Sequence, residues 1–129
     1  MSDAVLDASA LLALLLAEPG AERVRAALAD AAVSAVNLGE IVGHFARHGA
    51  SEAQARSVLD PLPVDWVPFD EELAYGVGLL VPATRPAGLS FGDRACLALA
   101  RRLGVRALTA DRAWPSVAAS VGVEIELIR

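Results

Sequence analysis

Short apolar segments typical of strands alternate with helical segments along the whole chain, and this alternation is the strongest constraint on its fold. The predicted strands span residues 4–6, 32–36, 64–69, 105–108 and 123–128. Strands that are separated by helices are typical of a mostly parallel sheet covered on both faces. The sequence therefore predicts an α/β fold with a central sheet of four to five strands.

Capping and helix-stopping residues set the boundaries of the predicted helices. We expect Ser9 to cap a helix that runs through Ala17 and stops at the sequence Glu-Pro-Gly of residues 18–20. The segment PATRPAG, residues 82–88, is predicted to be a loop because it holds two prolines and a glycine. The other predicted helices span residues 21–29, 38–48, 51–59, 70–80, 90–103 and 115–120.

The length and composition predict a single domain, residues 1–129, with a core built mainly from Ala, Leu and Val. The one cysteine, Cys96, cannot form an internal disulfide and is expected to be a buried structural thiol, which suits a reducing compartment. The apolar run from Ala8 to Ala17 is shorter than the ~20 residues of a membrane span. Asp3 lies where a signal peptide would be basic. We therefore expect a cytoplasmic protein with no membrane association.

The charge distribution leaves two interpretations open. The formal net charge of −5 argues against indiscriminate binding to nucleic acid, which depends on cations. Every basic residue is an arginine, however, and several of them lie in the segment from residue 85 to residue 112. A compositional bias with solvated helix faces explains these arginines as well as an RNA-binding patch does. The candidate RNA-binding residues are Arg85, Arg94 and Arg112.

Four acidic residues interrupt apolar segments where a strand ends or a helix begins. They are Asp7, Glu40, Asp93 and Asp111. Asp7 and Asp111 follow predicted strands, whereas Glu40 and Asp93 fall in the first turns of predicted helices. In open parallel sheets the functional site lies beyond the carboxyl ends of the strands, where helix N-termini also point. The predicted topology therefore brings all four acids to one edge of the sheet.

Carboxylates that gather at one place repel each other unless a cation joins them. A hard divalent ion such as Mg²⁺, or Mn²⁺ with similar preferences, takes oxygen ligands and can assist phosphodiester hydrolysis. Each acid also has an ordinary structural explanation. The pairs Asn37/Glu40 and Ser90/Asp93 both resemble helix capping boxes. Asp7 and Asp111 could be a turn residue and a helix cap, so the metal hypothesis depends on the four acids converging.

Four motifs in order, VLDASALLALLL, NLGE, LSFGDRACLALA and LTADRAW, resemble those of PIN-domain proteins, and within that family the VapC-type ribonuclease toxins of type II toxin–antitoxin systems. The similarity extends over nearly the whole chain, including the closing segment VEIELIR. It implies a three-layer α/β/α domain and an endoribonuclease that depends on Mg²⁺ or Mn²⁺. It further implies RNA as the substrate, a homodimer and a cognate antitoxin as partner.

The resemblance also assigns roles by position. It makes Asp7 and Asp93 direct metal ligands and catalytic residues. Glu40 would complete the ligand set or position the attacking water, and Asp111 would support a ligand, a water or a second ion. Thr109, in the segment TAD, would form a hydrogen bond at the site, although an ordinary strand threonine explains this residue equally well.

Two other functions remain open on the sequence. The chain could be a catalytically inactive PIN-like module that keeps its acids but binds RNA or protein without cleavage. It could also be an α/β phosphohydrolase with Asp7 as a covalent nucleophile. The sequence DAS argues against the second alternative, because it lacks the aspartate expected two positions after such a nucleophile.

Overall fold

The computed structural model describes residues 2–129, and its centre is a five-stranded sheet in which every neighbouring pair of strands is parallel. The strand order is β3-β2-β1-β4-β5. This confirms the predicted α/β fold and its sheet. The strands are β1 (Ala4–Leu6), β2 (Ala31–Ser34), β3 (Asp65–Val67), β4 (Arg106–Thr109) and β5 (Ile125–Leu127).

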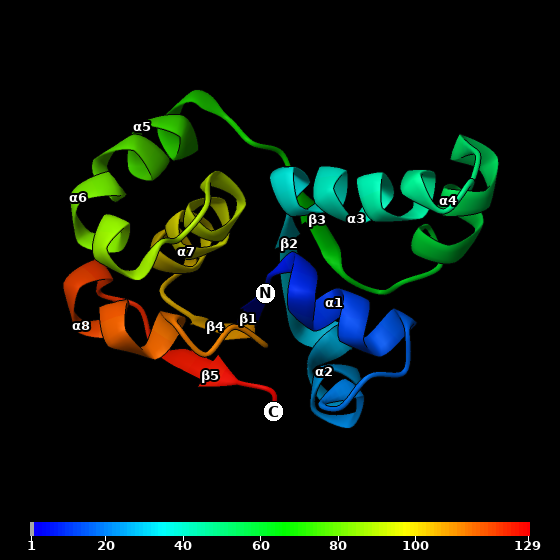
Figure 1. The fold of residues 1–129 in the computed structure, drawn as a ribbon, viewed down its shortest axis with the longest axis horizontal. Helices are drawn as coiled ribbons and strands as arrows, with labels where there is room; N and C mark the ends of the chain where they lie inside the picture. Colours follow the sequence, from blue (N-terminus) through cyan, green and yellow to red (C-terminus); the bar gives the residue numbers. More distant parts are fainter. Residues whose placement is uncertain (1) are drawn as a thin grey trace.

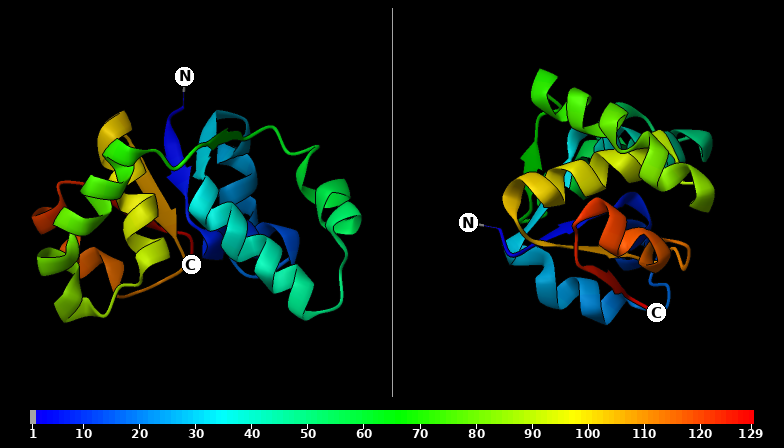
Figure 2. Two further views of the ribbon diagram at one scale, coloured as in Figure 1. Left: turned by 90° about the horizontal axis from the view of Figure 1, so that it is seen from above. Right: turned by 90° about the vertical axis from the view of Figure 1, so that its left-hand side faces the viewer.

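Helices cover both faces of this sheet (Figure 1). Helices α1 to α4 lie on one side and α5 to α8 on the other, and Figure 2 shows the same two layers from two further directions. The helices are α1 (Ala8–Leu15), α2 (Ala21–Ala27), α3 (Ala35–Arg47), α4 (Glu52–Leu59), α5 (Glu71–Leu79), α6 (Val81–Thr84), α7 (Phe91–Leu103) and α8 (Ala118–Val121).

The central strand β1 contributes to two separate cores because successive side chains point to opposite faces of a sheet. Val5 packs with residues of α5 and α7, whereas Ala4 and Leu6 pack with residues of α1 and α2. All three residues of β1 are buried, as expected for a parallel strand that is covered on both faces. The apolar character of these short strands therefore follows from burial on both sides.

Helix α1 begins two residues earlier than the sequence indicates, and the expectation that Ser9 caps it is wrong. The N-cap is Asp7, whose side chain accepts a hydrogen bond from the backbone N–H of Ala10. Aspartate and serine are similarly good caps, so the local sequence DAS does not decide between them. The Ser9 side chain instead contacts Asp7 itself.

The capping box expected for Asn37 and Glu40 is also absent, because α3 begins three residues earlier than predicted. Its N-cap is Ser34, the last residue of β2, whose hydroxyl accepts a hydrogen bond from the N–H of Val36. Asn37 consequently lies within the helix and is buried. The predicted box at Ser90 and Asp93 is present, and Gly104 ends α7 as expected.

The segment predicted to be a loop, residues 82–88, is largely helical. Helix α6 includes Pro82, and a 3₁₀ turn over Arg85–Ala87 includes Pro86. Both prolines lie in the first turn of their element, where a backbone N–H has no helical partner to lose. Gly88, with φ of 70°, ends the turn. Within residues 2–129, no helix has the length and apolar character needed to cross a membrane.

Candidate active site

Asp7 lies at the carboxyl end of β1 and is buried, with 4% of its surface exposed. Its Oδ1 accepts a 2.8 Å hydrogen bond from the N–H of Ala10. The hydroxyl of Ser9 donates to the same carboxylate at 2.8 Å, and the hydroxyl of Thr109 donates to Oδ2 at 2.7 Å. The position of this carboxylate is therefore fixed by three donors, two from the first turn of α1 and one from the end of β4.

Ser9 and Thr109 form a small hydrogen-bonded network between the ends of β1 and β4. The N–H of Ala110 donates to the Ser9 hydroxyl at 3.0 Å, and the N–H of Asp111 donates to the Thr109 hydroxyl at 3.0 Å. Thr109 thus donates a hydrogen bond to Asp7, which is the role that the family resemblance implied and not that of an ordinary strand threonine. Ser9 was missed as a site residue because its position before an apolar helical run resembles that of an ordinary N-cap.

The pKa of Asp7 is raised from 3.8 to about 6. Burial is the main cause, because it disfavours the charged carboxylate. The hydrogen bonds from Thr109, Ala10 and Ser9 oppose this increase, while the negative charge of Asp93 adds to it. Asp7 and Asp93 therefore interact electrostatically, although they are far apart in the chain.

Asp93 lies in the first turn of α7 and completes its capping box. Its Oδ2 accepts a 2.8 Å hydrogen bond from the N–H of Ser90, and its own N–H donates to the Ser90 hydroxyl at 3.2 Å. The side chain is partly buried. The structural explanation for Asp93 is thus confirmed, and the same carboxylate also faces the charge of Asp7.

Glu40 comes from the second turn of α3 and meets the start of α7. The Asn37 side-chain amide donates to Glu40 Oε1 at 2.7 Å and to the carbonyl oxygen of Gly92 at 3.1 Å. A Cβ atom on Gly92 would lie 2.5 Å from the Glu40 carboxyl carbon. The Glu40 carboxylate therefore packs directly against the residue that precedes Asp93.

The pKa of the buried Cys96 thiol is affected by three of the four acids. This pKa is raised well above the ordinary value, mainly by burial and further by the charges of Asp7, Asp93 and Glu40. The charges of these three carboxylates therefore all act on one buried side chain of α7. Asp111 differs, since it is exposed and its Oδ1 accepts a hydrogen bond from the N–H of Ala113 at 2.9 Å. Its link to the site is the backbone contact with Thr109.

A family comparison agrees with the parallel-sheet α/β fold. The model of the PIN domain matches residues 4–120. The chain belongs to the PIN-domain family. No curated protein sequence matches it significantly.

Solved structures share the fold of this PIN domain at low sequence identity. A DNA-bound VapBC complex from Salmonella typhimurium has 17% identity and a TM-score of 0.77, with 100% of both chains covered. VapBC-1 from nontypeable Haemophilus influenzae has 17% identity and a TM-score of 0.70, with 97% of each chain covered. VapC20 from Mycobacterium tuberculosis, described as a toxin that cleaves the sarcin–ricin loop, has 20% identity and a TM-score of 0.67, with 90% of this chain and 94% of that chain covered.

The carboxylates of this PIN domain suit a hard divalent ion by their chemistry, because oxygen atoms are the ligands that Mg²⁺ and Mn²⁺ prefer. The raised pKa of Asp7 beside the charge of Asp93 is the arrangement that a cation would relieve. Within residues 2–129, however, no three His, Cys, Asp or Glu side chains lie close enough together to hold one ion. Each carboxylate is instead held by its own hydrogen-bond donors.

The candidate RNA-binding arginines lie in different environments. Arg94 follows Asp93, is partly buried, and donates a 3.0 Å hydrogen bond to the carbonyl oxygen of Leu89. Arg85 and Arg112 are exposed. Arg102, which the sequence places on the same helical face as Arg94, forms an ion pair with Asp70 at 2.7 Å. An RNA-binding role for Arg85, Arg94 and Arg112 stays a prediction.

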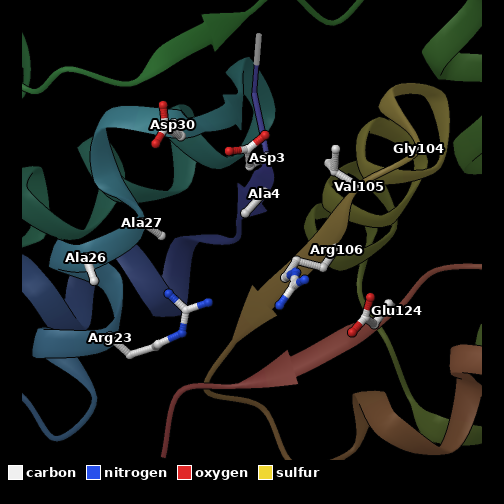
Figure 3. A pocket seen from close by; sticks show the side chains of 10 residues that line it. All are labelled: Asp3, Ala4, Arg23, Ala26, Ala27, Asp30, Gly104, Val105, Arg106 and Glu124. Atoms are coloured by element: carbon white, nitrogen blue, oxygen red, sulfur yellow. The ribbon is translucent and has the colours of Figure 1, made fainter.

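A polar hollow of about 500 Å³ lies at the opposite edge of the sheet, at the amino ends of β1 and β4. Figure 3 shows Arg23 from α2 and Arg106 from β4 reaching into this hollow. Both guanidinium groups form ion pairs with Glu126 of β5. The residues that line the hollow do not include Asp7, Glu40, Asp93 or Asp111, so the hollow is separate from the candidate site.

Proposed function

We propose that this PIN domain is a metal-dependent endoribonuclease that hydrolyses RNA phosphodiester bonds and is the toxin of a toxin–antitoxin pair. The observation that carries the proposal is the buried Asp7 carboxylate, whose pKa is raised to about 6 while the charge of Asp93 acts on it. Groups with strongly shifted pKa values are characteristic of functional sites. Membership of the PIN-domain family supports the same function.

In this proposal Asp7 and Asp93 hold Mg²⁺ or Mn²⁺, and Glu40 completes the ligand set or orients the attacking water. Asp111 supports the site from the loop after β4, and Thr109 fixes the orientation of Asp7 through its hydroxyl. When bound, the ion would polarise the scissile phosphate and lower the pKa of water. The protein side chains would position the reactants and exclude water from the buried side of Asp7.

The partners follow from the relatives of similar fold. VapBC complexes from Salmonella typhimurium and Haemophilus influenzae are among them, which supports a cognate antitoxin as partner. The proposal further includes a homodimer and a cytoplasmic location, as is usual for such toxins. Arg85, Arg94 and Arg112 would contact the RNA backbone through their positive charge.

The test compares cleavage of RNA by the purified protein, freed of any antitoxin, with Mg²⁺, with Mn²⁺ and with excess chelator. Asp7→Asn and Asp93→Asn should each lower the rate at least ~100-fold, because each removes a charge that the ion requires. Glu52→Gln is the matched control, since Glu52 is an exposed acid of α4 that pairs with Arg56. Full activity in either aspartate variant, or in chelator, would contradict the proposal.

An acid-retaining module that binds RNA or protein without cleavage is the second candidate. It is favoured by the hydrogen bonds that already hold the carboxylates of Asp7, Asp93 and Glu40 to their own neighbours. Calorimetric titration with Mn²⁺ separates the two functions. The nuclease should bind the ion in the wild type and lose binding in Asp7→Asn, whereas a binding module has no need of the ion.

A further inference from the structure

Asn37 is a polar residue in a buried position, and neither capping nor solvation explains it. It is 1% exposed and lies within α3, three residues before Glu40. Asparagine is a poor helix former in such interior positions. Its side-chain Oδ1 is buried and has no hydrogen-bond partner within residues 2–129. An unpaired buried polar atom is costly, so an apolar residue would suit the packing better.

The side-chain amide nitrogen of Asn37 donates two hydrogen bonds, whereas the side-chain oxygen accepts none from residues 2–129. The nitrogen donates to Glu40 Oε1 at 2.7 Å and to the Gly92 carbonyl oxygen at 3.1 Å. Both partners are acceptors, so only the amide orientation with Nδ2 toward them gives hydrogen bonds. The Asn37 side chain thus links α3 to the first turn of α7 by hydrogen bonds and holds the Glu40 carboxylate at that contact.

Gly92 supplies the space that this arrangement needs. A side chain at this position would overlap the Glu40 carboxylate, since a Cβ atom would lie 2.5 Å from the carboxyl carbon. The backbone of Gly92 is in an ordinary helical conformation and is not among the glycines with positive φ. The absence of a side chain therefore serves the approach of Glu40, and conformational freedom is not required.

We infer that Asn37 is the positioning residue for Glu40, and that Asn37 and Gly92 together form a cradle that holds this carboxylate beside Asp93. The inference rests on the proposed nuclease function, because it assigns Glu40 its place in that site. Asn37 itself contacts no reacting atom and acts through Glu40. Without the Asn37 amide, Glu40 is free to rotate away from α7 into solvent, because Glu40 is an exposed residue.

The first experiment measures kcat and KM for RNA cleavage in Mn²⁺. Asn37→Ala should lower kcat roughly 10- to 100-fold, the effect of losing one hydrogen bond to a charged group, and leave KM within about twofold. Thr84→Val is the matched control, since Thr84 is equally buried and its hydroxyl donates to the Leu80 carbonyl oxygen. The control should keep wild-type kcat even if it unfolds at a lower temperature.

A double-mutant cycle distinguishes positioning from general damage to the fold. In the background of Glu40→Gln, Asn37→Ala should cause little further loss of kcat, because the group that it positions has already lost its charge. Gly92→Ala should lower kcat in the same way without lowering the unfolding temperature, since the Glu40 side chain can move aside. Wild-type kcat in Asn37→Ala, or independent losses that multiply in the double variant, would overturn the inference.

A spectroscopic measurement on the metal-free protein tests the contact without any cleavage. The side-chain amide resonances of Asn37 should shift in Glu40→Ala and remain unchanged in Glu52→Gln. Unchanged Asn37 resonances in Glu40→Ala would overturn the inference. If the wild type showed this coupling but cleaved no RNA, the proposed function would fail while the structural role of Asn37 stood.

Discussion

The hydroxyl of Thr109, the last residue of β4, donates a 2.7 Å hydrogen bond to Oδ2 of Asp7, which directly follows β1. The two residues are 102 positions apart in the sequence. Their strands are neighbours in the parallel sheet, with Leu6 opposite Leu108. The contact stabilises a charged carboxylate, yet the burial of Asp7 has the larger effect, and its pKa remains raised to about 6.

The first prediction concerns the pH dependence of stability. Between pH 3.8 and about 6 the folded state binds more protons at Asp7 than the unfolded state does, so this residue makes stability fall as pH rises. The shift corresponds to about 3 kcal/mol. Asp7→Asn should therefore match the wild type near pH 4 and be more stable by up to about 3 kcal/mol above pH 6, as measured by urea unfolding in chelator.

The same experiment has an internal check with metal. At pH 7.5, excess Mg²⁺ or Mn²⁺ should reduce the difference in the free energy of unfolding between the wild type and Asp7→Asn. The ion binds the folded wild type and stabilises it, whereas Asp7→Asn cannot hold the ion. A difference in the free energy of unfolding that stays constant from pH 4 to pH 8 would contradict the raised pKa of Asp7.

The second prediction separates the two roles of Asp93. The side chain of asparagine can still accept the hydrogen bond from the N–H of Ser90, so Asp93→Asn should cost less than about 1 kcal/mol of stability while removing nuclease activity. The control is Ser51→Ala in the capping box of α4, whose partner is Gln54. It should cost about 1 kcal/mol and leave activity unchanged. Thermal unfolding and RNA cleavage, measured on both variants, would show whether capping alone accounts for Asp93.

The third prediction concerns the turn that holds the C-terminal segment. Gly20 has φ of 96°, and a Cβ atom there would lie 2.7 Å from the carbonyl oxygen of Ile128. Gly20→Ala should therefore cost about 3 kcal/mol or more, from backbone strain and the clash together. Gly49 has φ of 89° but no atom within 4 Å of its Cβ position, so Gly49→Ala should cost only about 1–2 kcal/mol. Equal losses in urea unfolding would refute the proposed close approach of Gly20 to Ile128.

The fourth prediction concerns Cys96. Its thiol is buried, and its pKa is raised well above the ordinary value by burial and by the neighbouring carboxylates, so it should be protonated and unreactive. In the native protein at pH 8, the rate at which a thiol-specific reagent modifies Cys96 should equal the rate of the unfolding that exposes the thiol. Rapid, stoichiometric labelling under native conditions would contradict the burial of Cys96.

Local signals in the sequence predicted much of the secondary structure. Ser51, Asp70 and Ser90 each cap the helix that was expected at their position, and Gly104 ends α7. These features depend on interactions within a few residues, which a single sequence displays directly. The mostly parallel sheet was also predicted, because strands that alternate with helices leave few other ways to bury both faces.

The errors occur where two local solutions have similar free energies. Both Asp7 and Ser9 can cap α1, and the tertiary contact from Thr109 helps to hold Asp7 in that position. Asn37 resembled a cap, yet α3 starts at Ala35, because Ser34 at the end of β2 serves as its N-cap. In each case the choice depended on a neighbouring strand and could not be read from the motif.

By itself, the sequence determined that this chain forms a covered parallel sheet and that its acids follow strands or open helices, because periodicity, caps and strand ends are local properties. Only the tertiary structure decided how those acids differ. The charges of Asp7, Asp93 and Glu40 all raise the pKa of the buried Cys96 thiol, whereas the Asp111 side chain remains exposed. Burial and the packing of α3 against α7 set these environments, and both arise from contacts between residues that are distant in the chain.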